Sequence, residues 1–359
     1  MDRLSYHVYQ KNSYDTHGMI IDPFFILNPP KERHVIYDAD VPLRSLLPKG
    51  LDGILVTGLG ASASRDAMPV IRMQACLQNQ GYAVGLLSAI SIKDHKSVRT
   101  VDIKKVQREL VKIGNLPERV LTDKDFKGFS RSEMKKAIIS VTDDYHGLEK
   151  LLTNKDLCID LALSRIKQVS NMEDKVLLAS ILCILGDNKY ASVLATSIRN
   201  SKTWDDGWNY TVMGQFGRCM SRLDSLIIAL GRTRNPAYLS VIQEKAESLY
   251  PEDFFSHFRA VAMAMDDMKD KKAVPVLTEM ITQPGVRSHA ISSYREARNK
   301  TVPGDVDTST RNKALKELCL ARALYTCGDK DNIGKRVLER YANGLQAHYA
   351  RFAYETLKD

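Results

Sequence analysis

The chain has 359 residues, of which 44% are hydrophobic and 26% charged, a composition typical of a folded protein and unlike that of a disordered one. Lys and Arg number 52 against 43 Asp and Glu, giving a net charge of +9, but the basic residues are scattered among acidic ones. A nucleic-acid-binding protein usually has a basic stripe or arm, so we expect no nucleic-acid partner.

The six cysteines include no Cys-x-x-Cys pair and mostly lie in apolar helical patterns, which argues against a zinc or iron–sulfur site. No stretch approaches the about 18 uninterrupted apolar residues of a membrane span, and the first residues have no apolar export-signal region. The sequence therefore predicts a soluble protein with no metal site and no membrane partner. The sequence leaves the compartment open: we expect the cytoplasm for the chain as it stands, or the periplasm if it derives from an exported parent.

Residues 1–95 form the first predicted module, an α+β unit in which Pro and Gly are frequent and β-branched residues cluster in short runs. The best strand candidates are 34–37 and 54–57. The second is a short apolar run between Gly53 and Gly58, which is typical of a buried parallel strand.

A long helix follows, predicted to start at 68–69 with Pro in its first turn and to run to about residue 89. Gly81 and Gly85 lie in its interior, where each costs about 1 kcal/mol relative to Ala. Two glycines inside one helix therefore suggest that the helix packs closely against a neighbouring element. Their small size would also leave room for a ligand beside the helix. Packing of the helix on a sheet with no ligand is the alternative.

From about residue 101 the apolar period becomes helical, with a helix capped by Asp102 and ended by Gly114. Residues 96–130 comprise this helix and a linker, and 131–359 an all-α domain. Its predicted helices lie near 130–141, 145–153, 156–169, 172–185, 190–199, 218–231, 236–249, 257–268, 271–282, 309–327 and 333–356, the last broken at Gly344.

These helices share a recurring sequence pattern: an apolar helix is followed by a polar turn such as Gly-Asp and then by a second apolar helix. Copies occur at 177–187, 225–231, 260–266 and 319–329. Their uneven steps lie close to the about 40–47-residue period of two-helix solenoid repeats, so the domain resembles a degenerate HEAT-like array. The segment 176–185 is apolar nearly all round, which predicts an inner helix between neighbouring repeats.

The pattern most suggestive of chemistry is an apolar run ending at Gly58, a loop of Gly, Ala and Ser over 58–64, and then a helix start. Small residues after a strand let a ligand approach the backbone, and the free N–H groups of a helix start favour a phosphate or a delocalised anion. Many α/β proteins share this order of elements, so the pattern alone is weak.

The region from about Tyr14 to Ala89 resembles the C-terminal, FAD-contacting segment of bacterial FAD-dependent oxidoreductases of the glutathione-reductase-like class, a family with many Bacteroidetes members. The resemblance begins with Tyr14-Asp15-Thr16-His17. It keeps its register through Arg44, Pro48, Lys49, Gly58, Ser62, Ile71, Arg72, Gly81 and Gly85.

The resemblance implies FAD as cofactor and hydride transfer between flavin and an unidentified organic substrate. In that class the loop passes the ribityl and pyrophosphate region, and the helix N-terminus faces the pyrimidine edge of the flavin. The implied cofactor contacts are Gly58, Ala61, Ser62 and the backbone of Val70, Ile71 and Arg72.

Two residues are candidates for a catalytic role, and for each of them the sequence also gives a reason against that role. His17 beside Asp15 is either an oriented acid or base or an exposed loop histidine. Arg65 occupies a position where the family commonly has His, and a guanidinium does not release its proton in proteins. Leu59 likewise replaces a common Arg, so the resemblance supports flavin binding more than catalysis.

The class binds the ADP half of FAD with a strand–GxGxxG–helix unit, and these 359 residues contain no GxGxxG. We therefore expect an incomplete FAD-binding fold: a second chain supplies the missing half, or the chain is a truncated product. The alternative function is a non-catalytic helical-repeat scaffold that binds protein or carbohydrate and carries a vestigial flavin segment.

One further loop combines aromatic and acidic residues, Trp204-Asp205-Asp206-Gly207-Trp208-Asn209-Tyr210. Aromatic stacking would suit a carbohydrate ligand, but a packed loop between repeats is the favoured interpretation.

Overall fold

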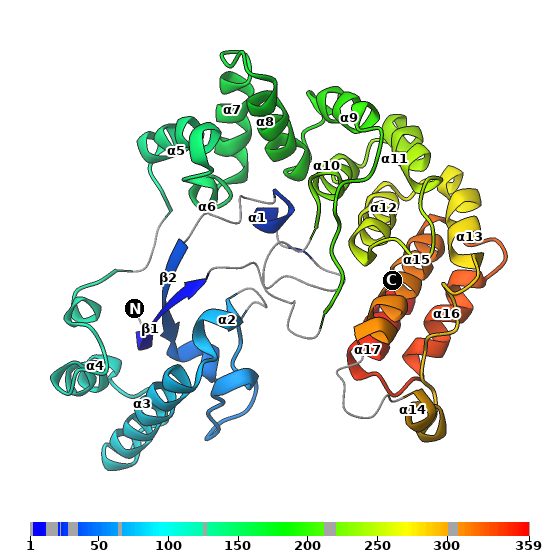
Figure 1. Cartoon of the computed structure of the whole chain (residues 1–359). Helices are drawn as coiled ribbons and strands as arrows, with labels where there is room; N and C mark the ends of the chain where they lie inside the picture. Colours follow the sequence, from blue (N-terminus) through cyan, green and yellow to red (C-terminus); the bar gives the residue numbers. More distant parts are fainter. Residues whose placement is uncertain are drawn as a thin grey trace. The chain divides into compact units, whose positions relative to one another are not determined.

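The computed structural model describes residues 3–11, 21, 23–27, 35–63, 67–124, 128–211, 220–300 and 308–358, and within these ranges the chain is predominantly helical (Figure 1). It divides into two compact units. The first comprises residues 1–15 and 31–127, and the second comprises 16–30 and 128–359.

The first unit has one described sheet, formed by β1 (Arg3–Lys11) and β2 (Val35–Pro42). The strands run antiparallel, with Tyr9 opposite Tyr37 and Arg3 opposite Pro42. Helices α2 (Met68–Ile71) and α3 (Gln74–Lys93) pack against β1. The described residues of this unit thus contain a single two-stranded ribbon beside several helices, and the incomplete α+β FAD-binding fold stays a prediction.

The strand predictions had different outcomes. Residues 35–37 of the predicted strand 34–37 lie in β2, whereas the strand at 54–57 is wrong. Ile54 is 48% exposed, and the Val56 N–H donates to the Leu46 carbonyl at 2.8 Å. This apolar run therefore lies against the turn of η1 (Leu43–Leu46) instead of joining the sheet.

The predicted helix over 68–89 is broken in two. It begins at Met68 as predicted, but α2 ends at Ile71 and the 20-residue α3 begins at Gln74. Arg72 lies near φ −101°, ψ −2°, and Met73 is extended at ψ 154°. The long helix consequently has its N-terminus six residues later than predicted.

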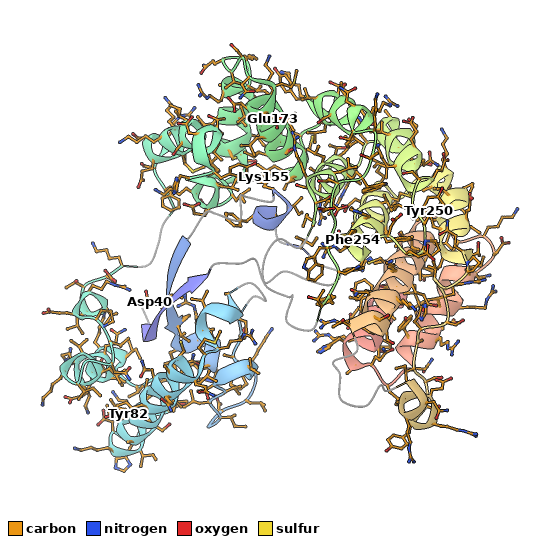
Figure 2. All side chains as sticks on the ribbon, in the orientation of Figure 1. Asp40, Tyr82, Lys155, Glu173, Tyr250 and Phe254 are labelled. Carbon is orange, nitrogen blue, oxygen red and sulfur yellow. The ribbon has the colours of Figure 1, made fainter. Side chains whose placement is uncertain are left out.

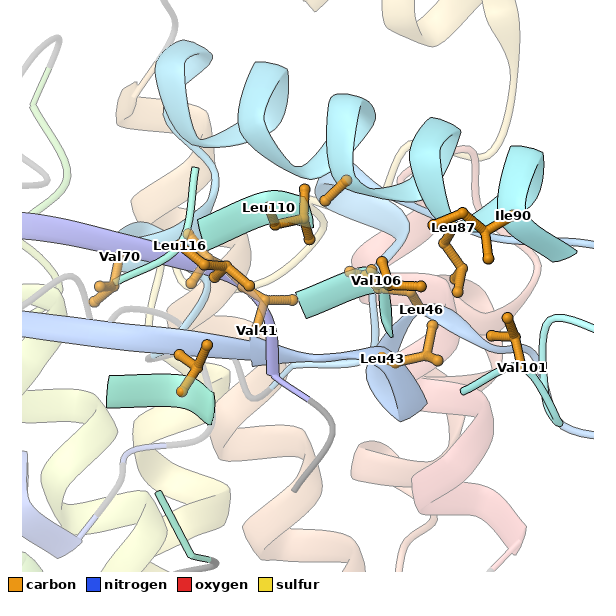
Figure 3. Close-up of a cluster of buried hydrophobic side chains, with 14 residues drawn as sticks. Val41, Leu43, Leu46, Val70, Leu87, Ile90, Val101, Val106, Leu110 and Leu116 are labelled. Atoms are coloured by element: carbon orange, nitrogen blue, oxygen red, sulfur yellow. The ribbon is translucent and has the colours of Figure 1, made fainter. Parts of the chain in front are cut away.

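The core of the first unit lies between β2, η1, α2, α3 and α4 (Ile103–Lys112) (Figure 3). The cap prediction for α4 is confirmed, because the Asp102 carboxylate accepts from the Lys104 N–H at 3.0 Å. The buried apolar side chains are Val41, Leu43, Leu46, Ala61, Val70, Ile71, Ala83, Leu87, Ile90, Val101, Val106, Leu110, Leu116 and Val120.

The regular elements described in the second unit are all helices. Two short helices were not predicted, α1 (Pro23–Ile26) and α14 (Tyr294–Lys300). The other helices are α5 (Arg131–Asp144), α6 (Leu148–Leu151), α7 (Lys155–Arg165), α8 (Met172–Ile184), α9 (Ala191–Asn200), α10 (Arg222–Gly231), α11 (Leu239–Ala246), α12 (Phe255–Met268), α13 (Val274–Thr282), α15 (Thr308–Cys327), α16 (Ile333–Ala342) and α17 (Ala347–Lys358).

Most of these helices form two rows (Figure 1). In one row α8 contacts α10, α10 contacts α12, and α12 contacts α15; in the other α9 contacts α11, and α11 contacts α13. The first row carries the unit's core, because its helices are apolar on nearly all sides. Every residue of 176–183 in α8 is buried, so this apolar segment is enclosed on nearly all sides.

Two absences hold for the part of the chain that the structure describes. None of its helices is both long and apolar enough to cross a membrane. Its His, Cys, Asp and Glu side chains form no group of three that could hold a metal ion.

Candidate functional site

The predicted flavin-facing loop is fixed to the first unit by its backbone. Its first residues form the short helix η2 (Gly58–Gly60), in which Gly58 has φ +73°, a conformation that glycine adopts without strain. The Ala61 N–H donates to the Gly58 carbonyl at 3.1 Å, and the Ser62 N–H donates to the Ser45 carbonyl at 2.8 Å. The loop is therefore folded over η1.

A buried glutamine of α3 links this loop to α2. The Gln80 side-chain N–H donates to the Ile71 carbonyl at 2.8 Å, and its oxygen accepts from the Gly58 N–H at 3.5 Å. Gln80 is completely buried, so its amide holds together two segments that the sequence predicted as cofactor contacts. The sequence analysis missed this residue, although Gln80 lies on the same helix face as Cys76, Ala83 and Leu87.

We expect a Gln80→Leu variant to lose about 1–3 kcal/mol of unfolding free energy, because the buried Ile71 carbonyl would be left without its donor. Urea unfolding followed by far-UV circular dichroism measures this loss. Gln78→Leu, at an exposed position two residues away on the opposite side of α3, is the control and should change stability by less than about 0.5 kcal/mol. Equal effects of the two variants would contradict the bridging role.

The side chains of the six predicted cofactor contacts differ in their exposure to solvent. The side chains of Ala61, Val70 and Ile71 belong to the buried core, each 6% exposed. Arg72 is half-buried, and Ser62 is exposed. The loop and α2 are thus brought together, and of the six residues only Ser62 has a fully exposed side chain, since both backbone groups of Gly58 are engaged by Gln80 and Ala61.

The backbone N–H groups of the predicted contacts are largely engaged within the chain. Those of Ala61 and Ser62 donate to Gly58 and Ser45, and that of Val70 donates to the Ala67 carbonyl at 3.0 Å. The chain of amide donors that would bind a phosphate is therefore not presented by these three residues in this conformation.

Both catalytic candidates, His17 and Arg65, lie outside the described residues. Leu59, the residue that departs from the family pattern in the same loop, is 70% exposed.

One face of α3 is open along much of its length. Gly81 and Gly85 are exposed, and no atom of the described residues lies within 4 Å of where a Cβ at either position would be. Tyr82, also on this helix (Figure 2), is 54% exposed. Ile92 is 76% exposed. The small residues therefore leave space beside α3 that the described chain does not fill.

The Trp204–Tyr210 loop is a packed loop, as the favoured interpretation held. The Trp204 ring lies 4.3 Å from the His257 ring, and its indole N–H donates to the Ser248 hydroxyl. The Tyr210 backbone exchanges two hydrogen bonds with the Asn312 side chain, at 2.8 and 2.9 Å.

Beneath this loop lies a buried polar cluster that the sequence analysis did not identify. Asp224 is completely buried and bonds to His257 Nδ1 at 2.7 Å, to the Ser256 hydroxyl at 2.6 Å and to the Ser221 N–H at 2.8 Å. Burial raises the pKa of Asp224, but these hydrogen bonds outweigh it and leave the pKa below its usual value. Because Gly207 covers His257 Nε2, the cluster serves packing rather than an open reaction site.

Comparison with known proteins identifies one region. Residues 9–110 match the family described as FAD dependent oxidoreductase, which is less than half of the chain. No curated protein matches the chain. The first unit therefore contains an FAD-dependent-oxidoreductase-like region.

Among solved structures, the chain is similar to the complex of CpcE and CpcF of phycocyanin lyase from Nostoc sp. PCC7120. The sequences are 17% identical, the similarity covers 55% of this chain and 75% of that chain, and the TM-score is 0.30. A TM-score this low does not establish a shared fold.

Proposed function

We propose that the first unit supplies the flavin-facing, C-terminal segment of an FAD-dependent oxidoreductase that transfers hydride between flavin and an organic substrate. The observation that carries this proposal is the family match over 9–110, which includes the loop, α2 and α3. The Gln80 bridge supports it, because it positions the loop against α2.

The residues present fit one side of the cofactor. We propose that Gly58, Ala61 and Ser62 contact the flavin half, beside the backbone of Val70, Ile71 and Arg72. Gly58 has no side chain to block the approach of a ligand, and the Ser62 hydroxyl is exposed. FAD, when bound, supplies the hydride chemistry. The chain's own contribution is to orient the ring and exclude water; His17 and Arg65 are proposed to act near the substrate.

The ADP half of FAD needs a GxGxxG unit, and none occurs in the 359 residues. We propose that the dinucleotide-binding half of such an enzyme docks on the apolar surface formed by α3 and the loop. Leu51 is 54% exposed, Ile54 48% and Leu59 70%, and the Gly81–Gly85 face of α3 is open. Such a surface is typical of an interface left uncovered.

We propose the same division of the chain that the sequence predicts: 1–95 as the oxidoreductase segment, 96–130 as helix and linker, and 131–359 as a HEAT-like repeat domain. The two rows of helices support the last assignment, since stacked helix pairs bury a continuous core. The repeat domain is proposed to bind a protein or glycan partner.

The visible spectrum tests the flavin proposal. Purified alone, the chain should be colourless; co-purified with the GxGxxG-bearing half of a family member, it should show a flavin band near ~450 nm. Absence of the band from both samples would overturn the proposal and favour the alternative, a helical scaffold with a vestigial flavin segment.

A pair of variants locates the docking surface. Gly85→Trp places a large ring on the open face of α3 and should abolish co-purification of the second half together with the band. Ile113→Trp, at an exposed site beyond the end of α4, is the matched control and should retain both. Loss of the band in neither variant would show that the second half docks elsewhere.

A further inference from the structure

A groove of about 680 Å³ lies on the second unit between α5 and α7 and reaches the start of α9. Its charged lining is strongly one-sided, with five cations and one anion. These residues are Arg131, Lys135, Arg165, Lys167, Lys189 and Asp160.

The groove also has an apolar strip between its cations. Ile138 and Leu161 are buried in its floor, whereas Ile139 is 52% exposed. A large aliphatic side chain exposed among lysines and arginines is unfavourable in water and is stabilised when a partner covers it.

Arg165 at the groove has an unused donor. Its Nε is buried and has no hydrogen-bond partner within the described ranges, while its Nη2 contacts the Thr142 hydroxyl at 3.4 Å. A buried N–H without an acceptor costs free energy, and an arginine fork pairs best with a carboxylate. The groove is thus complementary to a ligand with both carboxylates and aliphatic side chains.

We propose that this groove binds an acidic amphipathic helix of a partner protein, with glutamates or aspartates facing the cations and leucine-like side chains covering Ile139. The 14 residues of α5 span about 20 Å, so a helix of similar length would lie along it. None of the residues that line the groove is aromatic, which disfavours single-stranded nucleic acid, since its bases need stacking partners. The proposal deepens the partner role of the helical domain and is independent of flavin.

The test is a binding titration of the full chain with a fluorescein-labelled, 15-residue amphipathic peptide that carries leucines at i, i+3 and i+7, glutamates at the positions beside them and alanines elsewhere. Lys135→Glu combined with Lys167→Glu should weaken binding at least about tenfold, because two attractive charge contacts become repulsive. Ile139→Ser should weaken it about fivefold through loss of apolar burial.

The matched control is Lys272→Glu with Lys330→Glu, an equal charge change at exposed positions away from the groove, which should alter the affinity less than about twofold. Circular dichroism verifies that every variant is folded. Absence of saturable binding, equal losses in both double variants, or no effect of Ile139→Ser would overturn the proposal. So would tighter, groove-dependent binding of a 20-nucleotide oligothymidine.

Discussion

An Asp224→Ala variant is expected to lose about 3–5 kcal/mol of unfolding free energy, the cost of removing one partner from a buried, hydrogen-bonded pair. Three donors would be left without their acceptor: the His257 ring, the Ser256 hydroxyl and the Ser221 N–H. Because α10 and α12 both contribute to this cluster, we expect the loss to loosen the middle of the helical unit.

The same carboxylate predicts a pH dependence. The folded pKa of Asp224 is lowered, so its stabilising contribution is fully present above the unfolded value of about 4 and is lost as the pH falls through the folded pKa. The difference in stability between the wild-type protein and Asp224→Ala should therefore shrink in acid.

Tryptophan fluorescence during urea unfolding measures both effects, because Trp204 and Trp208 are the only tryptophans and lie over the cluster. Asp206→Ala, at an exposed position in the same loop, is the control and should cost less than about 0.5 kcal/mol. If Asp224→Ala costs no more than this control, or if its cost does not shrink as the pH falls below the unfolded pKa, the buried network does not stabilise the unit as argued.

A Gly231→Ala variant should also be destabilised, by about 1–3 kcal/mol, despite the better helix propensity of Ala. At the end of α10, a Cβ on residue 231 would lie 2.4 Å from the Ala264 Cα and 2.7 Å from its Cβ. Rotation of a side chain cannot relieve an overlap with backbone, so α10 and α12 would have to separate.

The same substitution at Gly85 is expected to raise stability instead of lowering it. The space beside Gly85 is open in the described structure, so the Ala variant should gain up to about 1 kcal/mol. The urea midpoint of unfolding should fall for Gly231→Ala, measured by tryptophan fluorescence. It should rise for Gly85→Ala, measured by circular dichroism. A rise for both would show that the close crossing at Gly231 does not limit stability.

Most helices could be predicted because apolar periodicity and end signals act locally. The Asp102 cap and the break at Gly344, between α16 and α17, are both found where the sequence placed them. The short helices α1 and α14 were missed, since four and seven residues offer too few turns for a periodic pattern.

The first unit was less predictable because its elements depend on distant pairing. The run 54–57 has a strand's composition, yet its described backbone contact is with η1. Composition cannot distinguish these outcomes, because an apolar run is equally compatible with any buried neighbour. Nor does the sequence reveal the break at Arg72–Met73, where no proline or glycine intervenes.

Of the candidate site, the sequence predicted the segments but not the side chain that joins them. Gln80 occupies a buried face of α3, and a polar residue among Cys76, Ala83 and Leu87 was the available signal. The pairing of Asp224 with His257 had no local signal, since the two residues lie 33 positions apart and meet only when α10 and α12 pack.

The small helix α1 has a practical consequence. Ile26 is completely buried and Leu27 is 4% exposed, and the Ser225 hydroxyl of α10 donates to the Ile26 carbonyl. Residues 16–30 therefore belong to the helical unit, although the residues before and after them belong to the first unit. A single cut in the gene cannot separate the two units cleanly. A fragment starting at residue 128 should gain solubility when the 16–30 peptide is added in trans, as in split-protein complementation.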